Sequence, residues 1–190
     1  MRLLLASKSP RRRELLSLLG LPMATVDIDV DEHLTSPLPP DTVAEHLARR
    51  KADAYPSHQL ADGDVLVTAD TVVVHNDTIM GKPHSRSEAI AMLQALSGDS
   101  HTVYTGVCLR SNSRNLSFTE STKVFFNTLS LADIEYYVDT YQPYDKAGAY
   151  GIQEWIGMVG IRAIEGCYYN VVGLPVATLY DNLRNKFMSN

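Results

Sequence analysis

A short segment near the beginning of the sequence gathers hydroxyls and cations where a strand gives way to a helix. Residues 7–12 (SKSPRR) follow a short apolar run, and Ser9 and Pro10 are typical of the first positions of a helix. Hydroxyls, guanidinium groups and the N–H groups of a helix start all bind phosphate. The segment therefore predicts a phosphate site that includes Ser7 and Arg11. The alternative is that its arginines are solvated first-turn residues, although cations there oppose the helix dipole.

One carboxylate interrupts the most apolar stretch of the chain. Asp70 lies inside residues 65–74, which otherwise consist almost entirely of valine, leucine, threonine and alanine. Burying a carboxylate is costly unless a cation or hydrogen-bond donors accompany it, so such a residue usually belongs to a site. Asp70 is therefore a candidate catalytic or metal-binding residue. Capping of a turn, or acceptance of backbone hydrogen bonds, is the structural alternative.

Other charged residues supply candidate ligands for a metal and for phosphate. Asp29, Asp31 and Glu32 form an acidic group whose oxygens suit Mg²⁺ or Mn²⁺, although acidic loops are more often simply solvated. Isolated lysines are usually surface residues, but three of them are candidate phosphate ligands: Lys51, Lys82 and Lys146. The six histidines have no metal-ligand spacing and are interpreted as structural. These residue types predict a phosphate-bearing ligand with a divalent metal, without naming a reaction.

The elements that must position these residues follow from hydrophobic periodicity and capping signals. Strands are predicted at residues 3–6, 26–30, 65–74, 101–109, 118–126, 161–164 and 168–172. Helices are predicted at residues 9–20, 42–54, 85–98 and 130–141 and from Pro175 onward, with capping boxes at Thr42/Glu45 and Ser85/Glu88 and a loop at 148–160. This order predicts an α/β fold, a mixed β-sheet flanked by helices, in a single domain over residues 1–190.

Composition narrows the class of protein. A net charge of −5 over 190 residues and an isoelectric point near 5.6 disfavour a partner that is a nucleic-acid polymer. The two cysteines are far apart, which suggests neither a disulfide framework nor a zinc site. No apolar run approaches the ~20 residues of a membrane span, and the first residues do not resemble a signal peptide. A cytoplasmic protein without a membrane partner is expected.

The sequence also resembles the Maf family of nucleotide pyrophosphatases in seven blocks that occur in order. The blocks are residues 5–12 (LASKSPRR), 50–52 (RKA), 69–73 (ADTVV), 81–83 (GKP), 101–107 (HTVYTGV), 145–153 (DKAGAYGIQ) and 170–175 (NVVGLP). The resemblance implies a fold of the Maf/inosine-triphosphatase type, with two lobes around a deep cleft, and frequently a homodimer. It also implies hydrolysis of the α–β phosphate link of a nucleoside triphosphate, with a divalent metal.

The resemblance assigns roles to individual residues. The proton acceptor of the family falls on Asp70, and its substrate-selecting positions fall on Arg12, Thr71 and Gln153. Thr and Gln at the last two positions mark the branch that acts on dTTP and UTP. The sister branch that acts on 7-methyl-GTP has Gln after the key Asp and a Lys-x-Glu run, and is disfavoured. Glu154-Trp155 departs from the small residue that many members carry after Gln153.

Because the substrate is a polyanion, Mg²⁺ or Mn²⁺ is expected on Glu32 and Asp70, where it would neutralise phosphate charge. Asp70 itself is a general base, a metal ligand or both. The competing interpretation of the same residues is a nucleotide-binding regulator of cell division and septum formation without significant turnover.

Overall fold

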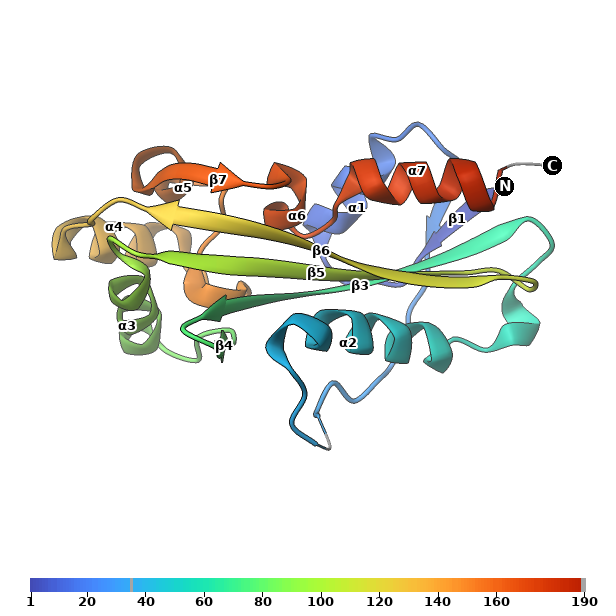
Figure 1. Cartoon of the computed structure of the whole chain (residues 1–190), viewed down its shortest axis with the longest axis horizontal. Coiled ribbons are helices and arrows are strands. Elements are labelled where there is room, and N and C mark those ends of the chain that lie inside the picture. The colour runs from blue at the N-terminus through green and yellow to red at the C-terminus, as the bar shows by residue number, and fades with distance from the viewer. Residues whose placement is uncertain (35, 189–190) are drawn as a thin grey trace. The chain divides into compact units, whose positions relative to one another are not determined.

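The computed structural model describes residues 1–34 and 36–188 and has an α/β architecture (Figure 1). Its sheet has the strand order β2-β1-β3-β5-β6-β7, with β4 paired to β3. The strands are β1 (Arg2–Leu5), β2 (Met23–Thr25), β3 (Asp64–His75), β4 (Thr78–Met80), β5 (Ser100–Arg110), β6 (Asn115–Phe126) and β7 (Ile161–Glu165). Strand β1 is parallel to β2 and β3, whereas β3/β4 and β6/β7 are antiparallel. The predicted mixed sheet is therefore confirmed.

The helices lie between and after the strands along the chain. They are α1 (Pro10–Ser17), α2 (Pro40–Ala54), α3 (Arg86–Leu96), α4 (Leu131–Tyr141), α5 (Trp155–Gly160), α6 (Tyr168–Val172) and α7 (Val176–Lys186), with 3₁₀ turns η1 (Ser57–Gln59) and η2 (Ala147–Ala149). Three predicted N-terminal signals are confirmed. Ser9, Ser85 and Ser130 each accept a hydrogen bond from a backbone N–H of the helix that follows.

The contacts divide the chain into two compact units. Unit 1 comprises Met1–Thr71, Thr105–Glu120 and Gly173–Asn190. In this unit α2 covers one side of the strands and α7 lies on the other (Figure 1). One apolar cluster of the unit joins Leu4 of β1 and Leu66 of β3 to Ala48 and Ala52 of α2. This cluster fixes α2, which carries Lys51, against the strand that carries Asp70.

Unit 2 comprises Val72–Tyr104 and Ser121–Val172. Its core joins Leu93 of α3 and Tyr137 of α4 to Val73, Phe126 and Ile156, all of them almost completely buried. Helices α3 and α4 pack against each other, and α3 also packs against η2. The core therefore supports the segment between Asp145 and Gln153, which contains two of the predicted site residues.

Several sequence predictions of secondary structure are wrong, for identifiable reasons. Residues 26–30 are not a strand, because β1 ends at Leu5, which pairs with Thr25, and pairing with β1 stops there. The aromatic segment 168–172 forms helix α6, whose buried Asn170 donates hydrogen bonds from its side chain to the Val103 carbonyl and the Thr122 hydroxyl. The expected loop at 148–160 contains the turn η2 and helix α5.

The two predicted capping boxes do not form as expected. Helix α2 begins at Pro40, and the Thr42 hydroxyl donates to the Pro39 carbonyl. Glu45 instead accepts hydrogen bonds from Ser117 at 2.6 Å and Thr119 at 2.9 Å on β6. In α3, the carboxylate of Glu88 accepts from the backbone N–H of His84 and not from that of Ser85. Tertiary partners for these glutamates replace the local ones.

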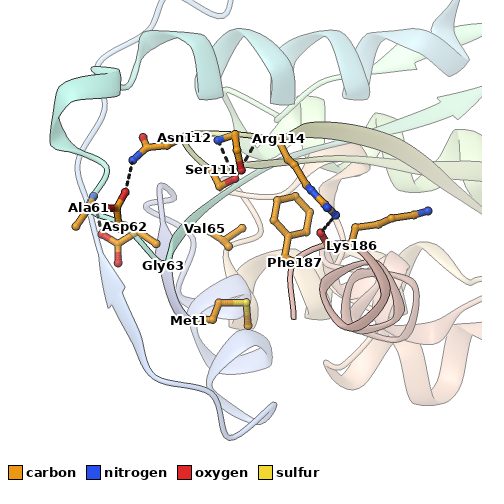
Figure 2. A pocket seen from close by; sticks show the side chains of 12 residues that line it. Met1, Ala61, Asp62, Gly63, Val65, Ser111, Asn112, Arg114, Lys186 and Phe187 are labelled. Atoms are coloured by element: carbon orange, nitrogen blue, oxygen red, sulfur yellow. Dashed lines mark hydrogen bonds between the residues drawn. The ribbon is translucent and has the colours of Figure 1, made fainter. Parts of the chain in front are cut away.

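A surface cavity of about 400 Å³ lies in unit 1 (Figure 2). It is formed by the loop before β3, the turn between β5 and β6, and the end of α7. Its lining includes Asp62, Asn112, Arg114 and Phe187, and no residue of the predicted site belongs to that lining. Asn112 and Arg114 donate to the carbonyls of Leu60 and Lys186 respectively. These bonds already engage polar side chains of the cavity within the protein.

Candidate active site

The junction between β1 and α1 orders the first candidate segment. Strand β1 is buried beyond Arg2 and leads into a loop in which the Ser7 hydroxyl accepts from the Ser9 N–H at 3.2 Å. The Ser9 hydroxyl accepts in turn from the Arg12 N–H at 3.4 Å and caps α1. Pro10 suits the first turn because it has no N–H to satisfy there. The junction therefore places Ser7 and Arg11 at a helix N-terminus, as predicted.

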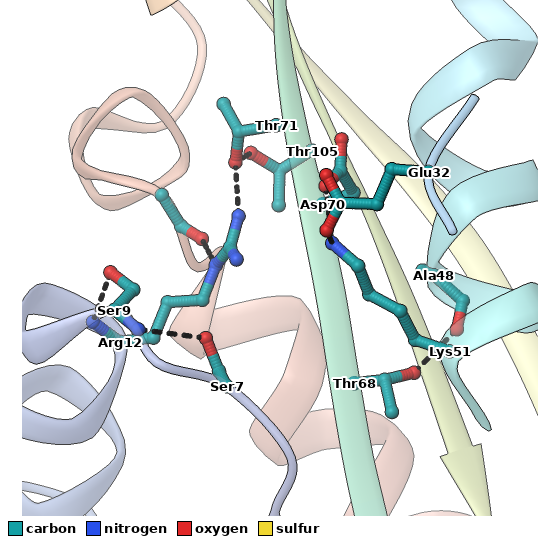
Figure 3. A network of polar contacts seen from close by, with 11 residues as sticks. Ser7, Ser9, Arg12, Glu32, Ala48, Lys51, Thr68, Asp70, Thr71 and Thr105 are labelled. Atoms are coloured by element: carbon teal, nitrogen blue, oxygen red, sulfur yellow. Dashed lines mark hydrogen bonds and ion pairs between the residues drawn. The ribbon is translucent and has the colours of Figure 1, made fainter. Parts of the chain in front are cut away.

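Arg12 is held by two hydrogen bonds to other segments of unit 1 (Figure 3). Its Nε donates to the Gly173 carbonyl and its Nη2 to the Thr71 hydroxyl, both at 2.9 Å. The Thr71 hydroxyl also forms a 2.9 Å hydrogen bond with that of Thr105 on β5. Burial lowers the pKa of Arg12, an effect that the nearby Asp70 carboxylate opposes. Arg12 still carries its charge at neutral pH because its ordinary pKa is so high.

The Gly173 carbonyl reaches Arg12 because its backbone adopts a conformation that suits glycine. Gly173 has a φ of +126°, a region that side chains rarely tolerate. It lies between α6 and α7, 161 positions after Arg12. Two predicted specificity residues, Arg12 and Thr71, therefore belong to one network with a late segment of the chain.

Lys51 joins the two predicted metal ligands. Its ammonium lies 2.6 Å from Asp70 Oδ1 and 2.9 Å from Glu32 Oε1. The side chains of Lys51 and Asp70 are only 11% and 14% exposed, whereas that of Glu32 is 55% exposed. The cost of burying the Asp70 carboxylate within β3 is thus offset by a direct cation. Asp70 is thus paired with a cation inside the strand, as a largely buried carboxylate requires.

Side chains of successive residues of β3 point to opposite faces of the strand. Thr68 and Asp70 both point toward α2, and the Thr68 hydroxyl donates to the Ala48 carbonyl at 2.6 Å. Thr71 points the other way, toward Arg12 (Figure 3). The strand therefore separates a carboxylate–lysine group from an arginine–threonine group.

Helix α2 approaches β5 closely because position 106 is glycine. A Cβ atom at Gly106 would collide with the backbone of Ala44 and Glu45. The close approach allows α2 to present Lys51 beside β3. Gly106 is therefore a structural requirement of the site and not a contact residue.

A divalent cation fits the chemistry of the Asp70 and Glu32 carboxylates. Both converge on one point, which Lys51 Nζ marks, and Mg²⁺ typically uses one or two carboxylates together with substrate phosphates and water. Within residues 1–34 and 36–188, no group of three or more His, Cys, Asp or Glu side chains is arranged to hold a metal. Asp31, another candidate, accepts from the His33 N–H and lies 3.9 Å from Arg50.

The other predicted residues belong to unit 2. Lys82 and Gln153 are exposed, and Lys146 is buried. The turn that carries Lys82 is tied to the segment that carries Lys146, because the Gly148 N–H donates to the Gly81 carbonyl at 3.0 Å. Gln153 lies within the turn closed by the 3.0 Å bond from the Glu154 N–H to the Gly151 carbonyl.

Glu154, which departs from the family pattern, contacts Lys146 and Tyr137 through its carboxylate. Its Oε1 lies 3.1 Å from the Lys146 ammonium, which also contacts Asp145 at 2.7 Å. Its Oε2 accepts from the Tyr137 hydroxyl, which itself accepts from the Gly151 N–H. Burial raises the pKa of Tyr137, and the hydrogen bond to the Glu154 carboxylate raises it further. No motif in the sequence marks Tyr137 as part of this network, and its place in an amphipathic helix indicates only burial.

Two further residues were also not singled out beforehand. Thr105 and Gly173 both contact the Arg12–Thr71 network, and both lie in blocks that carry the family resemblance.

Among the histidines, His101 is buried and shares a 2.7 Å hydrogen bond with the Tyr150 hydroxyl. Its structural interpretation agrees with that position. Among the described residues, no helix is long and apolar enough to cross a membrane.

Comparison with known proteins extends these observations. A family model described as Maf-like protein matches residues 2–186. A dTTP/UTP pyrophosphatase of Bacteroides thetaiotaomicron is 48% identical over 183 residues, which cover 96% of this chain and 94% of that protein. A dTTP/UTP pyrophosphatase of Porphyromonas gingivalis is 47% identical over 191 residues, which cover 100% and 96%.

A solved structure of the Staphylococcus aureus Ham1 protein gives a TM-score of 0.48 at 10% identity, over 66% of this chain and 72% of that one. That likeness is too low to bear on function. The family match, in contrast, extends over almost the entire sequence and includes all seven blocks. The chain belongs to the Maf family.

Proposed function

We propose that the protein is a nucleoside triphosphate pyrophosphatase that hydrolyses dTTP and UTP to the monophosphate and pyrophosphate. The observation that carries the proposal is the near full-length similarity, at 47–48% identity, to relatives named dTTP/UTP pyrophosphatase. The carboxylate–lysine group around Asp70 supports it, because phosphate hydrolysis needs groups that neutralise charge and orient water.

Asp70 is assigned to the water that attacks the α-phosphorus. The substrate is a polyanion, so positioning and charge neutralisation dominate the barrier. Asp70 orients that water or accepts its proton, the P–O bond to the β-phosphate breaks, and pyrophosphate leaves with the electron pair. Glu32 and Asp70 would hold Mg²⁺ or Mn²⁺, which would supply Lewis-acid neutralisation of the phosphate oxygens.

Further residues are assigned to the triphosphate. Ser7 and Arg11 stand at the N-terminus of α1, where N–H groups and the helix dipole favour anions. Three lysines complete the proposed set: Lys51, Lys82 and Lys146. Arg12 and Thr71 are assigned to substrate selection, together with Gln153.

Gln153 is assigned to the base. Its amide carries both a donor and an acceptor, which suits the O4/N3–H edge that uracil and thymine share. Cytosine presents the reversed pattern at this edge, so a Gln153 amide that a neighbour holds in one orientation leaves polar groups unpaired. The proposal therefore includes selection of UTP and dTTP over CTP.

A release assay tests the proposed activity. Purified protein with Mn²⁺ is incubated with a panel of nucleoside triphosphates, and pyrophosphate and monophosphate are quantified. Release of both from UTP and dTTP, lost in the Asp70→Asn variant, is expected. Binding of UTP without any release would favour the regulator of cell division instead. The proposal further includes a cytoplasmic location and a homodimer. Analytical ultracentrifugation of the purified chain tests the homodimer, and cell fractionation tests the location.

A further inference from the structure

One lysine ammonium forms ion pairs with two carboxylates at the proposed metal position. Lys51 Nζ lies 2.6 Å from Asp70 Oδ1 and 2.9 Å from Glu32 Oε1. These distances are those of charge-assisted hydrogen bonds. The side chains of Lys51 and Asp70 are nearly buried, so solvent screens their attraction only weakly. Without the ammonium, the two carboxylates would lose the cation that they share.

The ammonium and a divalent cation cannot share this point. A Mg²⁺ ion coordinates oxygens at about 2.1 Å, closer than the ammonium does. A lysine charge left beside the ion would repel it strongly in a partly buried site. Binding of a metal by Asp70 and Glu32 therefore requires Lys51 to leave.

We propose that Lys51 is a resident substitute for the divalent cation. It holds Asp70 and Glu32 in the metal-free protein, yields its position when the metal enters with the nucleotide, and then binds a phosphate oxygen of that nucleotide. The inference rests on the proposed function for the identity of the nucleotide. Its consequence is that metal binds weakly alone and much more tightly with substrate.

The surroundings of Lys51 suit such an exchange. Lys51 lies in the last turn of α2, and the helix itself is anchored one turn earlier by the bond from Thr68 to the Ala48 carbonyl. The lysine stem has four rotatable bonds, so its ammonium moves without movement of the helix. Glu32 lies outside the regular elements and its side chain is 55% exposed, which leaves it accessible to an entering ion.

The first test measures metal binding without nucleotide. Mn²⁺ is titrated into the full-length protein, and free Mn²⁺ is followed by electron paramagnetic resonance. Lys51→Met keeps the apolar stem and removes the charge, so it is expected to bind Mn²⁺ at least about tenfold more tightly than the wild type, within the usual range of site coupling. Weaker or unchanged binding would overturn the proposal.

A matched control separates a local effect from a general change in charge. Arg49 is an exposed residue of the same helix, two positions away. Arg49→Met removes the same unit of charge and is expected to change Mn²⁺ affinity less than about twofold, because exposed charges are well screened. An equal gain in both variants would show that net charge, and not the shared position, controls binding.

A double variant locates the ion. If the metal replaces the ammonium between Asp70 and Glu32, the gain from Lys51→Met disappears when Glu32→Gln is added. Persistence of the gain in the double variant would place the ion elsewhere and refute the exchange. Circular dichroism and thermal unfolding of each variant establish that the titrated protein is folded.

The final arm adds a UTP analogue whose α–β bridging oxygen is replaced by methylene. The wild type is expected to bind Mn²⁺ at least about tenfold more tightly with the analogue, and Lys51→Met to show a smaller increase. An equal increase in both would contradict the movement of Lys51 to phosphate. Since the nucleotide-free titrations do not depend on turnover, failure of the pyrophosphatase assay and failure of the exchange are separate results.

Discussion

Asp70 and Thr71 are consecutive residues of β3, and they face opposite sides of the strand. Asp70 contacts Lys51 of α2, whereas Thr71 accepts a hydrogen bond from Arg12 of α1. The alternation of a β-strand thus places the proposed chemical group and the proposed selecting group on different faces. Substitutions at the two positions are expected to affect different kinetic properties.

Replacement of Asp70 tests the chemical step. Asp70→Asn preserves shape but removes the charge that accepts a proton or binds metal, so kcat is expected to fall at least about 100-fold. Far-ultraviolet circular dichroism is expected to match that of the wild type. Steady-state rates of pyrophosphate release from UTP measure the effect, and a kcat near the wild-type value would remove Asp70 from the mechanism.

Arg12 and Lys82 are expected to differ in stability although both are assigned to substrate. Arg12→Ala and Lys82→Ala should each lower kcat/KM. The fall should correspond to a rise of roughly 1.5–3 kcal/mol in the activation free energy, the value of one charge-assisted hydrogen bond. Only Arg12→Ala also removes the anchors to Gly173 and Thr71, so only its melting temperature should fall. Differential scanning fluorimetry and UTP kinetics separate the effects. Unchanged kcat/KM in both variants would assign the two cations to other surfaces.

Selection of the base is tested at Gln153. Gln153→Ala is expected to lower kcat/KM for UTP and to flatten the ratio of UTP to CTP, because the donor and acceptor that distinguish the bases are lost. Wild-type activity should be similar for UTP and dTTP, which differ away from the O4/N3–H edge. A ratio that does not change in the variant would exclude Gln153 as the residue that reads the base.

The pairing of Glu154 with Lys146 makes a prediction about stability. Glu154→Gln leaves a nearly buried ammonium with less compensation and is expected to lower the free energy of unfolding by about 1–3 kcal/mol. Asp145→Asn should cost less, because the Asp145 side chain is 58% exposed and the pair is screened. Urea denaturation compares the two variants. An equal or larger loss in Asp145→Asn would contradict the assignment.

Acid sensitivity is expected from His101. Burial lowers the pKa of His101 from 6.5 to about 4. The unfolded chain therefore takes up a proton between these values that the folded protein does not, and stability falls as pH decreases from 6.5 to 4, by up to about 3 kcal/mol. His101→Gln should reduce this slope in urea denaturation at pH 7, 6 and 5.

The carboxylates of Asp64 and Asp99 do not obscure that window. Hydrogen bonds from Arg2 and His75 respectively lower their pKa values, so the stability that they contribute is lost only below about pH 4. A slope above pH 5 that His101→Gln leaves intact would show that another group titrates there.

The sequence predicted the parts of the fold that depend on local pattern. The apolar run around Asp70, the serine caps and the amphipathic helices all follow from short-range rules, and they appear where expected. Residues 168–172 were mistaken for a strand because aromatic and β-branched residues favour strands locally. The two buried hydrogen bonds of Asn170 stabilise the helix instead, and no local pattern encodes them.

Prediction of the site divides in the same way. The residue types of Asp70, Lys51 and Glu32 identified a charged group, but their convergence on one ammonium depends on α2 packing against β3. Thr105 and Gly173 contact Arg12 and Thr71 only after segments far apart in the sequence are brought together. Such contacts become visible from sequence only through resemblance to a family.

The Arg12–Gly173 hydrogen bond has a consequence for synthesis on the ribosome. Unit 1 contains segments that precede unit 2 in the sequence, yet its last segment, which starts at Gly173, emerges after every residue of unit 2. Domains generally fold as units while the chain grows from its N-terminus. A nascent chain that is stalled or truncated before residue 173 therefore lacks the carbonyl that accepts the hydrogen bond of Arg12 Nε, and of the two anchors of Arg12 only Thr71 remains in a prematurely terminated product.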